Sequence, residues 1–359
     1  YGQEKLLSEP LKLTWRGVNV NAEDKTAAGA GIELTSGPVR LTVSDLDAAW
    51  GEKASAAGTL ALEEARLGEL LAMAATLLER PDLPKIDRRL SLSGTARTKE
   101  GVILADLSGR LRDAGGRESS RLKIDGRMTP ETGKFNATLA AEEVALADVR
   151  EVLRSFDVEA APMQGTGRIT VTASRASGDD PITADGEAVV AGLTSEGRRI
   201  IDRVELKLTN LRYDPAQPRL TGERISLTGE KVEVTATAFQ ADLGEDFGAD
   251  GKAEWSLDVP WAMGVARTFT GRKDLPRGEG VLNGSVELAG DEGEIAFRDL
   301  NAAVVSGERE LLALTGRATY VPGKGGYSLD LSRLVADLGY VGEMAAAAGP
   351  KELARYGGR

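Results

Sequence analysis

Val204-Glu-Leu-Lys-Leu-Thr209 decides the fold class, because apolar and polar residues alternate along it. Val204, Leu206 and Leu208 would share one face of a β-strand, and the polar residues between them would share the other. The same period of two recurs in four further segments: Arg121–Gly126, Arg168–Ala173, Lys231–Ala236 and Glu294–Arg298. A period of two is typical of antiparallel strands with one covered and one solvated face.

Turn residues separate these strands. Gly115-Gly116, Ser177–Pro181, Asp214-Pro215 and Asp291–Gly293 each lie between two alternating segments. Val321-Pro-Gly-Lys-Gly-Gly326 predicts a hairpin turn between two such segments. The sequence therefore predicts a mostly β fold, in which an elongated, curled antiparallel sheet forms a repeating, solenoid-like β-groove with short helices at the repeat junctions.

Four segments have helical spacing of their apolar residues instead. They are predicted as helices over Leu67–Leu78, Val149–Phe156, Trp261–Phe269 and Leu334–Val341. Asp258, with Pro260 in the first turn, is the expected N-cap of the third helix, and Ser332 is the expected N-cap of the fourth.

The helices divide a degenerate repeat. Thr59–Leu67 and Thr138–Leu146 match at most positions, as do Trp255–Val259 and Tyr327–Leu331, and each second member leads into a helix as the first does. We therefore predict a first β unit over 1–66 and three units of helix plus strands over 67–147, 148–257 and 258–331. The start of a further unit is predicted over 332–359.

The composition excludes several classes of function. The chain has neither cysteine nor histidine, which removes the usual zinc, haem and iron–sulfur sites and the Ser-His-Asp and Cys-His mechanisms. A net charge of −11 disfavours nucleic acid as a partner. Ser120-Arg-Leu-Lys123 matches a nucleophile motif, but on a strand its serine and lysine would face opposite sides. The chain is expected not to be an enzyme, and we expect no cofactor, metal or catalytic residue.

The apolar face of such a sheet must be covered or must bind something. It can pack on itself as an ordinary sandwich core, or it can line an open groove that binds acyl chains. Few aromatic residues are present to fill a core, which favours the groove. The residues expected to line it are Leu122, Ile124, Ile169, Val171, Val204, Leu206, Leu208, Val232, Val234, Ile295 and Phe297.

Two junctions resemble the AsmA-like superfamily, which includes the TamB-like and YhdP-like envelope proteins. They are Asp148–Val158 running to Pro162–Val171, and Asp258–Met263 running to Gly278–Gly284, and Leu11–Val20 is in keeping with them. The resemblance implies a periplasmic segment of a Gram-negative-type envelope protein that is anchored in the inner membrane through residues outside this chain. It also implies a role in outer-membrane biogenesis, in which phospholipid is bound or conducted between the two membranes.

Two alternatives remain from the residues alone. A scaffold or chaperone for outer-membrane proteins would have closed cores, exposed strand edges and no bound lipid. A polysaccharide-processing enzyme on a β-solenoid would need a carboxylate-lined cleft with stacked aromatics, and aromatic residues make up only 4 % of the chain.

Overall fold

The structure is a computed structural model. It describes residues 12–36, 39–51, 54–70, 88–113, 115–147, 163–195, 197–242, 248–270, 275–291, 294–321 and 326–342. The chain divides into two compact units, unit 1 over Tyr1–Asp180 and unit 2 over Pro181–Arg359. The prediction of a mostly β fold of curled antiparallel sheet with short helices is confirmed.

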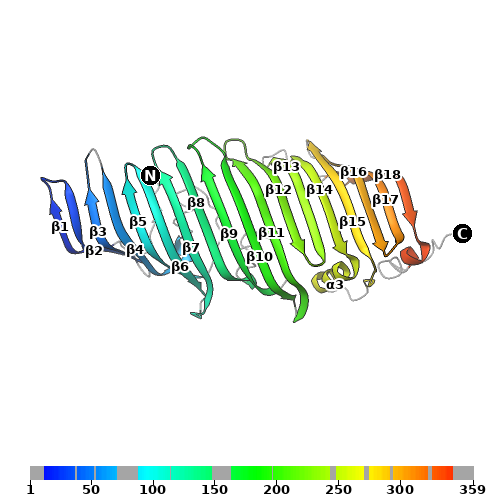
Figure 1. Ribbon diagram of the computed structural model, residues 1–359, viewed down its shortest axis with the longest axis horizontal. Coiled ribbons are helices and arrows are strands. Elements are labelled where there is room, and N and C mark those ends of the chain that lie inside the picture. The colour runs from blue at the N-terminus through cyan, green and yellow to red at the C-terminus, as the bar shows by residue number, and fades with distance from the viewer. Residues whose placement is uncertain are drawn as a thin grey trace. The chain divides into compact units, whose positions relative to one another are not determined.

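In unit 1, nine strands follow one another as sequential antiparallel neighbours (Figure 1). The strands are β1 (Lys12–Asn21), β2 (Thr26–Ser36), β3 (Val39–Ala49), β4 (Ser55–Arg66), β5 (Arg89–Lys99), β6 (Val102–Arg112), β7 (Glu118–Thr129), β8 (Lys134–Ala145) and β9 (Met163–Arg175). Short turns join most of them, and the predicted turn at Gly115-Gly116 lies between β6 and β7.

Unit 2 repeats this meander with nine more strands. They are β10 (Ile182–Ser195), β11 (Arg198–Asp214), β12 (Arg219–Gly229), β13 (Val232–Asp242), β14 (Gly248–Asp258), β15 (Val281–Asp291), β16 (Glu294–Ser306), β17 (Arg309–Val321) and β18 (Gly326–Ala336). One helix, α3 (Val259–Thr270), connects β14 to β15. All five alternating segments of the sequence lie in strands, namely β7, β9, β11, β13 and β16, except that Lys231 precedes the start of β13.

The predicted helices have different outcomes. The third is confirmed as α3, and the Trp261 backbone N–H donates to Asp258 Oδ1 over 2.7 Å, which makes Asp258 its N-cap. Of the first predicted helix, residues 67–70 are helical and residues 71–78 lie outside the described residues. All of the second, residues 149–156, lies outside them, and residues 146–147 are helical.

The fourth predicted helix is wrong in its start. Leu334 belongs to strand β18, and Ser332 is the extra residue of a bulge between its neighbours' pairings with β17. A short helical segment begins only at residue 338, where Asp337 Oδ1 accepts from the Tyr340 backbone N–H at 3.1 Å. Pairing with β17 continues to Ala336 and overrides the helical spacing of the apolar residues.

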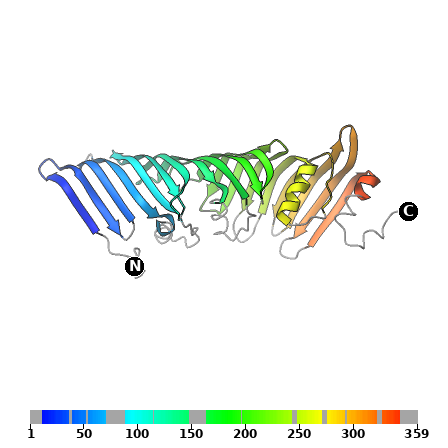
Figure 2. The same cartoon turned by 90° about the horizontal axis from the view of Figure 1, so that it is seen from below.

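An even number of strands separates successive helices of a unit, so the helices lie at the same edge of its sheet. Strands β4 and β8 run in the same direction, so the helical residues 67–70 and 146–147 that follow them leave the same edge of unit 1. In unit 2, β14 and β18 likewise share a direction, and α3 and residues 338–342 lie at one edge (Figure 1). Figure 2 looks onto this edge and shows α3 in front of the strand ends.

The predicted division into units over 1–66, 67–147, 148–257, 258–331 and 332–359 stays a prediction. The compact units divide at Asp180 and Pro181, inside the third predicted range. The sequence repeats and the compact units therefore divide the chain at different residues.

Candidate functional site: the apolar faces

Each unit has one apolar face and one polar face. Residues directly opposed across antiparallel strands point to the same side of the sheet, so the register assigns every side chain to a face. In unit 1, one cross-strand row of apolar residues runs through all nine strands: Leu13, Leu34, Leu41, Leu62, Leu92, Gly109, Leu122, Ala141 and Ile169. The predicted lining residues Leu122 and Ile169 are members of this row.

A second complete row lies beside the first. It comprises Trp15, Ile32, Val43, Leu60, Gly94, Leu107, Ile124, Leu139 and Val171. The structure therefore brings all four predicted lining residues of unit 1 onto one face, in two adjacent rows. We call the side of unit 1 that carries these two rows its apolar face.

The next row on the apolar face of unit 1 is made only of glycine and alanine. It crosses six strands as Gly58, Ala96, Ala105, Gly126, Ala137 and Ala173. Larger side chains flank it, with the Ile124 row on one side and Ile103, Met128 and Phe135 on the other. This row of short side chains forms a shallow trench along the sheet, about 24 Å long for five strand spacings. Long side chains flank it on both sides at β6, β7 and β8, whereas the row beyond it holds Ala56, Thr98 and Arg175 at β4, β5 and β9.

The apolar face of unit 2 is built in the same way. Its first row is Val190, Val204, Gly229, Val232, Leu257, Leu282, Val304, Leu312 and Ala336. Its second is Ala188, Leu206, Leu227, Val234, Trp255, Gly284, Ala302, Leu314 and Leu334. Leu208 follows in the next row, opposite Ile225, and Phe297 lies opposite Leu288 and Ala318. Ile295 lies opposite Tyr320 on the same side.

Most of these side chains are half-buried rather than buried. Of the eleven predicted lining residues, Val232 is buried and the others are intermediate. Within the described residues, a packed cluster forms only where α3 and Tyr340 meet the first row of unit 2, around Val259, Val304 and the fully buried Leu311. A sandwich core would bury the second row as well, so the described residues leave much of each apolar face accessible.

Two glycines of unit 2 accommodate large neighbours, Gly284 in the second row and Gly222 of β12 opposite Phe239. A Cβ on Gly284 would lie 2.3 Å from Trp255 Cζ2, and one on Gly222 would lie 2.2 Å from Phe239 Cζ. The indole and phenyl rings therefore lie over the backbone of the adjacent strand. This lowers the height of the aromatic side chains above the sheet and keeps the apolar face even.

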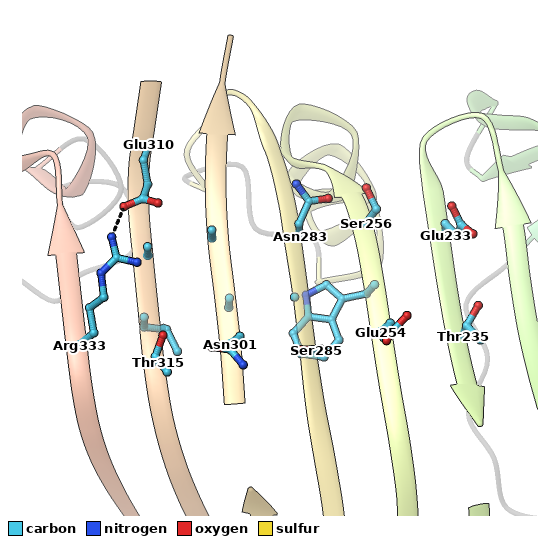
Figure 3. Close-up of a pocket in the computed structure, with 16 residues that line it drawn as sticks. Glu233, Thr235, Glu254, Ser256, Asn283, Ser285, Asn301, Glu310, Thr315 and Arg333 are labelled. Carbon is cyan, nitrogen blue, oxygen red and sulfur yellow. Dashed lines mark hydrogen bonds and ion pairs between the residues drawn. The ribbon is translucent and has the colours of Figure 1, made fainter. Parts of the chain in front are cut away.

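Two hollows lie along the polar side of the strands, one in each unit. In unit 2, a hollow of about 510 Å³ is lined by short hydroxyl and amide side chains, by longer charged ones, and by four members of the second apolar row, namely Trp255, Gly284, Ala302 and Leu314. Figure 3 shows Ser256, Asn283, Ser285, Asn301 and Thr315 on this side, with Arg333 paired to Glu310 at 3.0 Å. A similar hollow of about 810 Å³ lies in unit 1 around Thr59, Thr95 and Asp106, and Gly58, Ala96, Ala105 and Gly126 of the glycine and alanine row also line it. None of the eleven predicted lining residues lines either hollow. The two hollows are therefore not the apolar groove that the sequence predicts.

Two repeat-equivalent glutamates form ion pairs where the strands lead into helical residues. Glu64 and Glu143 both have positive φ, 47° and 57°, at bulges of β4 and β8. Glu64 pairs with Arg89 at 3.1 Å and also with Arg112, while Glu143 pairs with Arg121. Arg89 and Arg112 are directly opposed across β5 and β6, so Glu64 neutralises two like charges that would otherwise repel. The acidic pairs Glu63-Glu64 and Glu142-Glu143 thus have a structural use, and the sequence signal for it was their repetition.

The hydrogen bond from Arg89, together with the charge and hydrogen bond of Arg112, holds the pKa of Glu64 below its usual value. A carboxylate with a lowered folded-state pKa stabilises the fold above its unfolded pKa of about 4.3, and this contribution is lost as the pH falls through the folded pKa. Replacing Glu64 with Gln is therefore expected to lower the melting temperature at pH 7 and to flatten its decline in acid. Thermal melts from neutral to acidic pH measure this.

Glu63→Gln is the matched control, since Glu63 is the next residue and pairs with Arg40 at a longer 3.4 Å. Its melting curve should keep the pH dependence of the parent chain. Equal pH dependence for the parent chain and the Glu64 variant would contradict the stabilising role of Glu64.

Other features carry less chemistry. Ser120 is buried, whereas Lys123 is exposed on the polar face, so the Ser-x-x-Lys motif does not bring the two side chains together. In the described part of the chain, no group of three or more acidic side chains is arranged to hold a metal ion. No helix of the described residues is long and apolar enough to cross a membrane. Trp261 donates through Nε1 to the Ile200 carbonyl at 2.7 Å and anchors α3.

The chain was compared with models of protein families, with curated proteins and with solved structures, and none of them matches it.

Proposed function

We propose that the apolar faces bind the acyl chains of phospholipid, and that the chain is a periplasmic segment of an AsmA-like protein that conducts phospholipid between the inner and outer membranes. The observation that carries the proposal is the continuity of the apolar rows. In unit 1 two rows cross nine strands without a charged residue, and most of their side chains stay half-exposed. An apolar surface of this extent is typical of an interaction site.

The dimensions of the face suit an acyl chain. The glycine and alanine trench of unit 1 is about 24 Å long. One leaflet of a bilayer contributes half of a hydrocarbon core of about 30 Å, so the trench can take a whole extended acyl chain. Each methylene moved from water onto the apolar face would contribute about 0.8 kcal/mol, and the half-exposed neighbours would gain from being covered.

The direction of the trench supports conduction as well as binding. It runs across the strands, so a chain lying in it would meet equivalent rows at each strand and would find no deep pocket to hold it. Weak, repeated contacts of this kind favour movement along the sheet. The inner-membrane anchor implied by the resemblance would supply one end of this path.

Lipid extraction and mass spectrometry of the purified chain test the proposal. Phospholipid in at least equimolar amount, either co-purified or taken up from phosphatidylethanolamine and phosphatidylglycerol vesicles, is the expected result. Absence of lipid under both conditions would overturn it and would favour the scaffold or chaperone in outer-membrane assembly, which needs no lipid.

A further inference from the structure

Two arginines without a partner line the hollow of unit 1. They are Arg97 of β5 and Arg127 of β7, and both are exposed. Every other described arginine of unit 1 takes part in an ion pair or a hydrogen bond, whereas these two have neither within the described residues. A guanidinium group that lines a hollow and has no carboxylate partner is available to bind an anion.

The strand register brings the two arginines into one row on the polar side. Leu104 of β6 lies between them, directly opposed to Arg97 on one side and to Arg127 on the other. Figure 1 shows β5, β6 and β7 as adjacent strands. The two arginine Cα atoms are therefore two strand spacings apart, roughly 10 Å. Because the Leu104 side chain is shorter than the arginines that flank it, both guanidinium groups can converge above it on one oxyanion.

Two carboxylates without a partner lie in the next polar row of the same hollow. Asp106 and Asp125 are directly opposed across β6 and β7, and neither forms an ion pair or a side-chain hydrogen bond within the described residues. Like charges at directly opposed positions destabilise a sheet. A cation between the two carboxylates would remove this repulsion. The carboxylate row lies two residues along the strands from the arginine row, roughly 7 Å.

We propose that this hollow binds a phosphoethanolamine group. Its phosphate would lie above Leu104 between Arg97 and Arg127, and its ammonium would lie between Asp106 and Asp125. Two carbon atoms join the ammonium to the phosphate ester oxygen, so the two charges can occupy adjacent rows. A primary ammonium has three N–H donors, which is enough to bind both carboxylates. The hollow lies on the side of the sheet opposite to the two apolar rows, so the proposal does not depend on the proposed binding of acyl chains.

Ligands with a single charge fit the hollow less well. Inorganic phosphate would leave Asp106 and Asp125 opposed and would add negative charge beside them. A metal ion would leave both arginines without a partner, and the described residues contain no group of three acidic side chains that could hold one. Phosphocholine carries both charges, but its quaternary ammonium has no N–H to donate. The arrangement therefore selects a phosphate next to a primary ammonium.

Equilibrium dialysis of the full chain with labelled O-phosphoethanolamine tests the proposal. Saturable binding to one site is expected, tighter than that of inorganic phosphate, ethanolamine or phosphocholine. Arg97→Gln and Arg127→Gln should each weaken it by about tenfold or more, because each removes a charge-assisted pair with the phosphate. Arg212→Gln is the matched control and should leave binding unchanged, since Arg212 is an exposed arginine of β11 in unit 2 that also has no partner within the described residues.

Replacing both Asp106 and Asp125 with Asn separates a change of selectivity from a loss of fold. This variant should bind inorganic phosphate more tightly than the parent chain does, because the repulsion of the anion is removed, and it should no longer prefer phosphoethanolamine. An absence of saturable binding to the parent chain, undiminished binding by the two arginine variants, or a preference for phosphoethanolamine that survives in the Asn variant would each overturn the proposal.

The phosphoethanolamine group can belong to a lipid headgroup or to a soluble ester. Sedimentation with phosphatidylcholine vesicles, with and without phosphatidylethanolamine, distinguishes these sources. Extra binding to the vesicles that contain phosphatidylethanolamine, lost in Arg97→Gln, would support the proposal with a lipid headgroup as the ligand. Dialysis binding without this difference between vesicles would support it with a soluble ester as the ligand.

Discussion

Replacing Ile124 and Leu206 with Asp together is expected to remove bound phospholipid from the chain. Both residues lie in the second row of their unit's apolar face, and both are half-buried. An acyl chain bound over either position would displace water from the new carboxylate. This desolvation would weaken binding by on the order of several kcal/mol. Since about 1.4 kcal/mol is a factor of ten in affinity, lipid recovered by extraction and mass spectrometry should fall by at least about tenfold.

The control places the same two new carboxylates on the polar faces and also removes the charge of one lysine. Lys123→Asp with Thr209→Asp changes exposed residues of the same two strands, β7 and β11, and should leave the bound lipid unchanged. Ile124→Thr with Leu206→Thr makes both positions polar without adding charge and keeps side chains that suit a strand. Circular dichroism of every variant shows whether it is folded, so a loss of lipid that results from unfolding is recognised. Equal loss of lipid in the polar-face control would show that lipid does not bind at the apolar faces.

Truncating Leu311 to Ala is expected to give a large loss of stability. Leu311 is 1 % exposed and packs with Val259, Val304 and Tyr340 in the cluster that joins α3 to the sheet. Leu-to-Ala changes at buried sites typically cost about 2–5 kcal/mol, through lost burial and the cavity that remains. Urea unfolding monitored by tryptophan fluorescence should show the destabilisation, since Trp255 and Trp261 both lie in unit 2.

Leu338→Ala provides the comparison, because Leu338 is 84 % exposed and close in sequence to Tyr340 of the same cluster. Its removal should change the free energy of unfolding by about 0.5 kcal/mol or less. Similar losses for the two variants would contradict the view that the stability of unit 2 depends on this small cluster.

Alternation along the strands was sufficient to predict the sheet and the face on which each predicted lining residue lies. Leu122, Ile124, Val204 and Leu206 needed no information beyond their polar neighbours, because a strand turns successive side chains to opposite sides. Asp258 was also readable as a helix start, since a capping residue followed by Pro260 is a local signal.

Pairing between strands determined several features that the local sequence pattern could not predict. The spacing of Leu334, Leu338 and Val341 suits a helix, but β17 supplies backbone partners as far as Ala336 and keeps Leu334 in a strand. The alignment of rows depends on bulges such as those at Glu64, Ala238 and Asp299, whose positive φ values no local pattern announces. The hollows on the polar faces were also missed, because they arise from short side chains that meet only when distant strands are in register.

The shared edge of the helices limits how such a chain can change in length. Four strands separate the helical residues 67–70 from residues 146–147 in unit 1, and four separate α3 from residues 338–342 in unit 2. Inserting or deleting one strand would place the next helix at the opposite edge of the sheet and would reverse the direction of every later strand. Only whole hairpins can be gained or lost, so the reach of the protein would grow during evolution in increments of two strands, about 10 Å each.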